Sequence, residues 1–192
     1  MRGMGEMTAA GGLLVTIMLG GGCAGAQATA SEPARLAWAE LKNERGESVG
    51  SAVFREEDGR VRIVVQASGL TPGHHGVHVH AVGRCEPPGF QSAGDHFNPL
   101  GKKHGLENAD GAHGGDLPNL EADANGRTEY AAVTDRLTLA PGRISVFDND
   151  GSAIVIHAGP DDQRTDPSGN SGDRVLCGQL VTGPAGVLAP RP

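Results

Sequence analysis

Apolar and polar residues alternate with a period of two along most of this chain, and no segment shows a sustained helical period. In RVRIVVQAS, residues 60–68, the side chains of Val61, Ile63 and Val65 share one face, with Arg62 on the other. That pattern is typical of a half-buried β-strand. Segments of the same kind occupy residues 36–42, 50–56, 127–134, 143–148, 152–157 and 174–181. The sequence therefore predicts an antiparallel β-sandwich or barrel.

Two segments interrupt the alternation and are rich in Gly, Pro, Asn and Asp, namely residues 82–126 and 158–173. Loops of that length are uncommon in a compact domain, and they are usually functional or disordered. The first segment contains three of the chain's 8 histidines, so we expect it to be functional.

The N-terminal residues indicate export. The apolar run Leu13–Leu19 is too short to span a bilayer and is typical of a signal peptide, with small residues after it. Cys23 leaves two alternatives open: it is the lipidated first residue of a bacterial lipoprotein, or it is removed with the signal peptide. We expect a signal peptide or lipoprotein signal with a tether over 1–30, one domain over 31–183 and a flexible tail over 184–192. The protein would then lie in the periplasm or cell envelope.

The net charge bears on which partners the protein can bind, and the cysteines bear on the compartment in which it folds. The net charge of -7 argues against a nucleic-acid partner, because the phosphate backbone attracts basic proteins. In an exported protein Cys85 and Cys177 favour a disulfide, the alternative being two free buried thiols.

The segment GVHVH brings two histidines onto one strand. Alternation places His78 and His80 on the same face, about 6–7 Å apart at Cα, where both rings can reach one ion. The alternative is two exposed polar residues on a solvated face. His157, which ends the apolar segment SAIVIH, and His75, just before GVHVH, are further candidates; we expect His75 to orient a ligand rather than to be one.

The long loop supplies a second candidate set. His96, His104, His113 and Asp116 each stand within two residues of Gly, Pro or Asn, where a backbone can curl around an ion. Three imidazoles and a carboxylate make a complete tetrahedral zinc site with no open position, which is the structural type of zinc site. The alternative is a set of hydrophilic loop residues in solvent.

Several motifs together resemble those of the copper/zinc superoxide dismutases. They are GHHGVHVHAVGRCEPPGFQSAGDHFNPLGKKHG (73–105), HGGDLPN (113–119), GSAIVIHAGPDD (151–162) and GNSGDRVLCG (169–178). They follow one another in the order of the family, and the resemblance covers about residues 34–182. The interval from His80 to Cys85 is shorter, and that from Cys85 to His96 longer, than in the eukaryotic cytosolic enzymes. This resembles the bacterial exported branch, periplasmic or lipoprotein.

The resemblance implies a fold and a set of roles. The fold would be all-β, a Greek-key antiparallel β-sandwich or flattened barrel of about eight strands with two long functional loops. Copper would be held by His78, His80, His96 and His157. Zinc would be held by His96, His104, His113 and Asp116, with His96 bridging the two ions as an imidazolate. The other implied roles are catalytic for Arg174 and His96, ligand-linking for Asp161, and disulfide-forming for Cys85 and Cys177.

The implied activity is disproportionation of superoxide to dioxygen and hydrogen peroxide, an antioxidant defence outside the cytoplasm. Each subunit would carry one copper and one zinc ion. Superoxide would be the substrate, the protein would be a monomer or a homodimer, and any membrane anchoring would pass through lipidated Cys23. The alternative is an exported metal-binding or metal-buffering protein on the same fold, since fold alone does not give activity.

Overall fold

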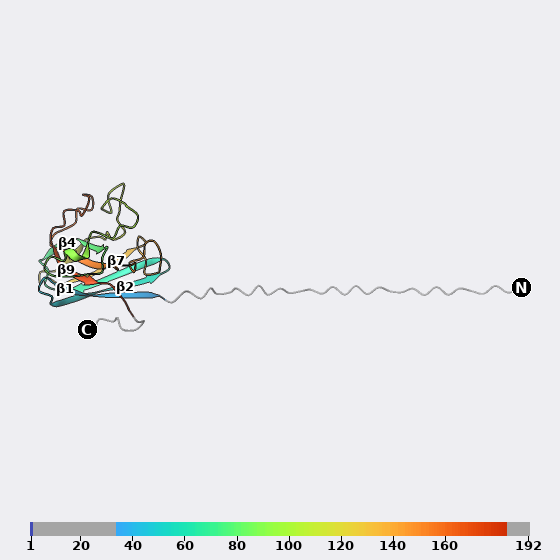
Figure 1. The fold of residues 1–192 in the computed structure, drawn as a ribbon, viewed down its shortest axis with the longest axis horizontal. Coiled ribbons are helices and arrows are strands. Elements are labelled where there is room, and N and C mark those ends of the chain that lie inside the picture. Colours follow the sequence, from blue (N-terminus) through green and yellow to red (C-terminus); the bar gives the residue numbers. More distant parts are fainter. Residues whose placement is uncertain (2–33, 184–192) are drawn as a thin grey trace. The chain divides into compact units, whose positions relative to one another are not determined.

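The computed structural model of the protein describes Met1 and residues 34–183 (Figure 1). The segments expected to be a signal (1–30) and a tail (184–192) lie, apart from Met1, outside the described residues. Within the described part the secondary structure consists of β-strands and one short 3-10 helix, Gln91–Ala93. The strands are β1 Arg35–Asn43, β2 Ser48–Glu57, β3 Arg60–Ala67, β4 Gly73–His75, β5 Val77–His80, β6 Leu120–Ala122, β7 Thr128–Thr134, β8 Ala153–His157, β9 Arg174–Gln179 and β10 Val181–Thr182. No helix of the described residues is long and apolar enough to cross a membrane.

The strands form one curled antiparallel sheet of 8 strands in the order β5-β8-β9-β1-β2-β3-β7, with β10 paired to β1. The pairs β1–β9 and β3–β7 join strands that are far apart in the sequence, as in a Greek-key arrangement. A small second sheet pairs β4 with β6. The all-β prediction with about eight strands is therefore confirmed.

Alternation explains how these strands bury one face. In β3 the side chains of Val61, Ile63 and Val65 are fully buried and Arg62 is exposed, as the pattern predicts. Strand β7 alternates strictly between buried and exposed residues along its whole length. The buried faces meet in one apolar core that includes Leu41. Burying such side chains contributes about 1.5–3 kcal/mol each, which fixes the strand register.

The prediction of a strand over residues 143–148 is wrong. Ser145 and Val146 are both buried, so the segment does not alternate, and it forms only an isolated bridge between Thr138 and Ser145. A buried carboxylate organises this region instead. Glu56 accepts hydrogen bonds from Oγ1 of Thr138 (2.5 Å) and from the backbone N–H of Leu139 (2.9 Å). These bonds hold the chain against the sheet without a strand partner.

The two long loops lie together. Figure 1 draws the loop between β5 and β6 and the loop between β8 and β9 rising on the same side of the sheet. They are joined by a backbone bond from the N–H of Glu107 to the carbonyl of Gln163 (3.0 Å) and by an ion pair between Arg164 and Glu107. The irregular segments that interrupt the alternation therefore form one surface beside β5 and β8.

Candidate metal centre

Strands β5 and β8 bring three of the predicted ligands together. They pair antiparallel, with His78 opposite Val155 and His80 opposite Ala153, and His157 ends β8 beside them. The ring centroids of His78 and His80 are 6.3 Å apart, and those of His78 and His157 are 4.7 Å apart. All three side chains are buried. The alternative in which His78 and His80 are exposed on a solvated face is therefore excluded.

His96 stands between the strand histidines and the loop histidines. Its ring centroid lies 3.9 Å from that of His78, 5.1 Å from that of His104 and 5.5 Å from that of His113. The loop reaches this place because it runs along β5, where the N–H of Phe97 donates to the carbonyl of Val79 (2.8 Å). One ring therefore faces both groups of candidate ligands.

Hydrogen bonds leave one nitrogen free on each strand histidine. Nδ1 of His80 donates to the carbonyl of Gly94 (2.9 Å), and Nδ1 of His157 donates to that of Gly172 (3.1 Å). Because a carbonyl oxygen only accepts, the proton sits on Nδ1 and the lone pair on Nε2. Within the described residues four buried nitrogens have no hydrogen-bond partner here, namely His78 Nδ1, His80 Nε2, His96 Nε2 and His157 Nε2.

Unpartnered buried nitrogens are costly, and these four residues each offer a donor atom within 4.8 Å of the others. Burial lowers the pKa of His78 to about 3 and that of His157 to about 4, so the rings are neutral near pH 7. A neutral imidazole is the form that binds a metal. The site has the donor chemistry of a four-nitrogen copper site.

A second group gathers around one carboxylate oxygen. Oδ1 of Asp116 lies 3.0 Å from Nδ1 of His96, 3.0 Å from Nδ1 of His104 and 3.4 Å from Nδ1 of His113. Oδ2 is held in place by the backbone N–H groups of Gly105 (2.8 Å) and His113 (2.9 Å). Nδ1 of His104 is buried and has no hydrogen-bond geometry to any partner, despite its closeness to Asp116.

A purely geometric grouping of donor atoms joins His78, rather than His113, to His96, His104 and Asp116. The hydrogen bonds favour His113. Nε2 of His78 is taken by Asp161 (2.7 Å), and its Nδ1 belongs to the four-nitrogen group. Nδ1 of His113, in contrast, faces Nδ1 of His96 at 3.4 Å.

The electrostatics of the second group suit a cation. Burial alone would lower the pKa of His104, but the nearby carboxylates of Asp116 and Asp161 outweigh it and raise that pKa to about 9. Despite burial, the neighbouring histidines lower the pKa of Asp116. The two carboxylates therefore favour positive charge in this pocket, and three imidazoles with one carboxylate make up the donor set of a structural zinc site.

Asp161 links the two groups. Its Oδ2 lies 2.7 Å from Nε2 of His78 and its Oδ1 lies 3.0 Å from Nε2 of His104. His75 is also buried, as expected for an orienting residue. Its Nδ1 lies 2.7 Å from the backbone carbonyl of His157 and its Nε2 lies 2.8 Å from that of Thr71.

Arg174 is half-buried at the start of β9. Its Nη1 donates to the carbonyl of Phe90 (2.9 Å) and its Nη2 to that of Gly94 (2.8 Å). It lines a cavity of about 750 Å³ together with His80, His157 and other residues of the two loops. The cavity therefore leads from the surface to the four-nitrogen group.

The predicted disulfide is present. Cys85 and Cys177 are bonded, with Cα atoms 5.7 Å apart, and their bond packs with buried Phe90 and Ala93. The alternative of two free thiols is excluded. Cys23, the candidate lipidation site, lies outside the described residues.

Residues 48–180 match the family model of the copper/zinc superoxide dismutases. The chain belongs to this family. A Cu-Zn superoxide dismutase of Aquifex aeolicus is 43% identical over 142 residues, which cover 73% of this chain and 84% of that protein. One from Caulobacter vibrioides is 40% identical, over 75% of this chain and 84% of that protein. The crystal structure of a SOD-like protein from Bacillus subtilis, 41% identical, covers 75% of this chain and 97% of that one with a TM-score of 0.72.

Membership in the copper/zinc superoxide dismutase family makes the chain a superoxide dismutase with copper and zinc as cofactors, and its histidine groups can hold both. The relatives are bacterial, in agreement with the resemblance seen in the sequence.

Sequence reasoning missed two side chains that contact the second group. Nη2 of Arg136 donates to the backbone carbonyl of Asp116 (2.6 Å), and Oδ1 of Asp166 accepts from the backbone N–H of His104 (2.8 Å). Both side chains contact backbone atoms, which every residue type has, so the partner's identity does not reveal the contact. No sequence pattern available in one chain would have identified them.

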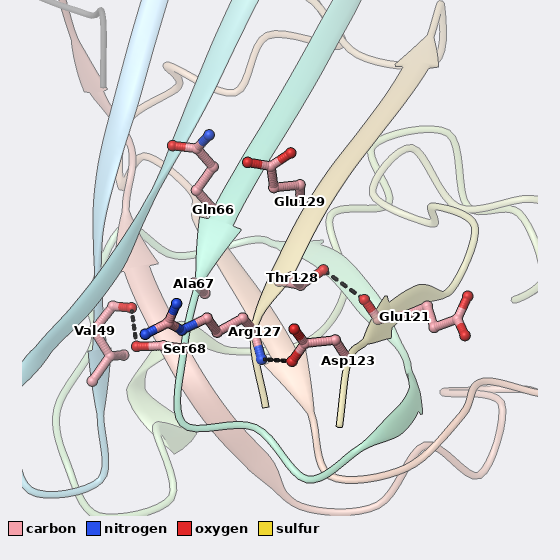
Figure 2. Close-up of a pocket in the computed structure, with 9 residues that line it drawn as sticks. All are labelled: Val49, Gln66, Ala67, Ser68, Glu121, Asp123, Arg127, Thr128 and Glu129. Atoms are coloured by element: carbon pink, nitrogen blue, oxygen red, sulfur yellow. Dashed lines mark hydrogen bonds between the residues drawn. The ribbon is translucent and has the colours of Figure 1, made fainter. Parts of the chain in front are cut away.

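A second cavity, of about 810 Å³, lies at the ends of β3, β6 and β7 (Figure 2). It is lined by Val49, Gln66, Ala67, Ser68, Glu121, Asp123, Arg127, Thr128 and Glu129. It contains none of the predicted site residues, and we assign it no part in the metal centre.

Proposed function

We propose that this superoxide dismutase disproportionates superoxide to dioxygen and hydrogen peroxide at an imidazolate-bridged copper–zinc centre, as an antioxidant defence outside the cytoplasm. The observation that carries the proposal is the position of His96. Its Nε2 belongs to a group of four unpartnered nitrogens, and its Nδ1 faces the carboxylate of Asp116. One ring can therefore serve both ions.

The proposed ligand atoms follow from the hydrogen bonds. The copper set is Nδ1 of His78 with Nε2 of His80, His96 and His157. The zinc set is Nδ1 of His96, His104 and His113 with Oδ1 of Asp116. The remaining nitrogens of His78 and His104 both contact Asp161, which orients one ligand of each set.

Copper supplies the one-electron chemistry, because it can accept an electron from one superoxide and donate it to the next, whereas zinc has no accessible redox state. The protein supplies a proton. Nε2 of His96 takes up a proton when it is free and passes it to the second superoxide, while water provides the other proton. Two superoxide anions and two protons thus give one dioxygen and one hydrogen peroxide.

Delivery of the substrate depends on local charge. Superoxide is an anion and the chain has a net charge of -7, so the protein as a whole repels it. Arg174 and Lys102 line the cavity that leads to the copper set, and Lys102 makes no ion pair among the described residues. A narrow channel can focus such charges against the net charge, an effect for which superoxide dismutases are a standard example.

Replacing Arg174 by alanine is expected to lower kcat/KM about tenfold and to leave copper and zinc content unchanged. The rate of the parent protein should fall as salt rises, because exposed charges are screened over about 10 Å at 0.1 M ionic strength. Pulse radiolysis at several salt concentrations measures both effects. Arg84→Ala is the control, because it removes an exposed arginine of the loop between β5 and β6 that does not line the cavity. Loss of metal from Arg174→Ala, or a parent rate that rises with salt, would contradict the guiding role.

The location, the domain limits and the assembly complete the proposal. The apolar run Leu13–Leu19 and the disulfide both suit an exported protein, because disulfides persist in oxidising compartments. We propose a periplasmic or cell-envelope protein with its domain over 31–183, as a monomer or homodimer, anchored only if Cys23 is lipidated. Mass spectrometry of the mature N-terminus distinguishes a lipidated Cys23 from a cleaved signal peptide.

The activity is tested on metal-reconstituted protein. Loaded with one copper and one zinc ion per chain, the protein is expected to remove superoxide, and His157→Ala loaded in the same way should lose nearly all activity. The alternative of a metal-buffering protein predicts stoichiometric binding of both metals without superoxide removal. That result would refute the proposed activity and leave the binding intact.

A further inference from the structure

Asp166 contacts the proposed zinc ligands from outside the ligand set. Its Oδ1 accepts the backbone N–H of His104 (2.8 Å) and lies 3.8 Å from Nε2 of His113. Its Oδ2 pairs with Nζ of Lys103 (3.0 Å). Asp166 belongs to the loop between β8 and β9, whereas these three partners belong to the loop between β5 and β6. One carboxylate therefore joins the two long loops at the zinc side of the site.

The loop that carries Asp166 is held by hydrogen bonds of its own. Oδ1 of Asp162 accepts the N–H groups of Arg164 (2.9 Å) and Thr165 (2.8 Å), and the N–H of Gly169 donates to the carbonyl of Thr165 (2.7 Å). These local bonds present the carboxylate of Asp166 to the other loop. They leave little conformational freedom to be lost when its contacts with the zinc loop form.

Asp161 and Asp166 differ in what they contact. Asp161 contacts a ring of each proposed metal set, through His78 and His104. The partners of Asp166 are Lys103, His104 and His113, which all belong to the loop between β5 and β6, and none of them is in the proposed copper set. Removal of Asp166 should therefore weaken zinc binding without weakening copper binding, whereas removal of Asp161 should affect the binding of both metals.

We propose that Asp166 is a positioning residue for zinc, which fixes the backbone of His104 and the ring of His113 and makes zinc affinity depend on the contact between the two long loops. The inference rests on the proposed ligand set. Because Nδ1 of His104 faces Asp116, a fixed backbone at His104 keeps that nitrogen in place before the ion arrives. Partners of this kind, which contact a ligand residue rather than the metal itself, typically contribute 10–100-fold in metal affinity.

Activity alone would be a poor readout, because loss of Asp166 also frees the charge of Lys103 at the mouth of the channel. The test is therefore zinc affinity and copper affinity of the full-length, metal-free chain, each measured by competition with a chromophoric chelator. The variants are Asp166→Ala and Asp166→Asn. Asp148→Ala is the matched control, since Asp148 is an exposed carboxylate that lines the same channel and contacts no zinc ligand.

Asp166→Ala is expected to weaken zinc binding about 10–100-fold and to leave copper binding unchanged. Asp166→Asn should recover only part of the zinc affinity, because its amide oxygen can still accept the N–H of His104 but carries no charge toward Lys103 and His113. Asp148→Ala should match the parent for both metals. Cobalt substituted for zinc gives a second readout, since its visible spectrum should broaden in Asp166→Ala if the ligands are less well fixed.

Unchanged zinc affinity in Asp166→Ala, or an equal loss for zinc and copper, would overturn the inference. If Asp166→Ala does not fold, as judged by its thermal unfolding, Asp166→Asn decides: it should bind zinc more weakly than Asp148→Ala, and equality of the two overturns the inference. Failure of the parent chain to bind one zinc ion would instead refute the proposed ligand set, so the two failures are distinguishable.

Discussion

Replacing Cys85 and Cys177 together by serine is expected to lower the free energy of unfolding by about 4–5 kcal/mol. The bond closes a loop with a sequence separation of 92 residues, and the chain-entropy model assigns about that much to a loop of this length. Domains of this size are stable by only about 5–15 kcal/mol. The double variant should therefore be marginally stable and is best studied at low temperature.

Urea unfolding of the metal-free protein, with and without a reductant, measures this loss. Reduction of the parent should give the same midpoint as the double variant, which serves as a control for the serine side chains. A loss below about 1 kcal/mol would mean that the reduced chain is already restricted before it folds.

The same variant should also affect catalysis. The disulfide packs with Phe90, and the carbonyl groups of Phe90 and Gly94 are the partners of Arg174. Loosening that segment frees the guanidinium, so the double variant should show a reduced kcat/KM resembling that of Arg174→Ala. Because both changes act through the same contact, their effects should not add when they are combined.

Gly169→Ala is expected to abolish most of the activity and to weaken zinc binding about 100-fold. A methyl group at this position would overlap Oδ1 of Asp161 and lie 2.7 Å from Nε2 of His104. Gly169 also has φ +63°, in the left-handed region that side chains with a Cβ rarely adopt. The change therefore displaces the carboxylate that orients one ligand of each metal.

The control is Gly46→Ala, because Gly46 has φ +76° and nothing within 4 Å of the added methyl group. It should reproduce the backbone strain without disturbing the metals. Zinc and copper content by mass spectrometry, beside superoxide removal, separates the two variants. Full metal content in Gly169→Ala would show that Asp161 moves aside without consequence for the ligands.

The proposed ligands could be identified from the sequence because their signals are local. His78 and His80 alternate on one strand, and the donors in the long loop are conspicuous in a chain with only 8 histidines. The strand expected at 143–148 could not be rejected from the sequence. Its apolar residues match a strand pattern, and only the carboxylate of Glu56, which is distant in the sequence, shows how that region is held.

The contacts that position the proposed ligands could not be predicted from the sequence, because they too join residues that are distant along the chain. Arg136 donates to the backbone carbonyl of Asp116, 20 positions away. Asp166 accepts from the backbone N–H of His104, 62 positions away. Such pairs depend on how two loops meet, which residue types do not encode one at a time. The assignment of residues to copper or to zinc came from the family resemblance. The structure showed which nitrogen of each ring has no hydrogen-bond partner.

The carbonyl oxygen of Gly94 accepts hydrogen bonds from both His80 and Arg174. Arg174, which we propose to attract the anion, and His80, a proposed copper ligand, therefore share one main-chain acceptor. Every amino acid carries a backbone carbonyl, so a side-chain substitution at position 94 would not by itself remove this shared acceptor. Replacing the amide between Gly94 and Asp95 by an ester leaves all side chains intact. It would weaken this carbonyl acceptor and so perturb both His80 and Arg174 at once.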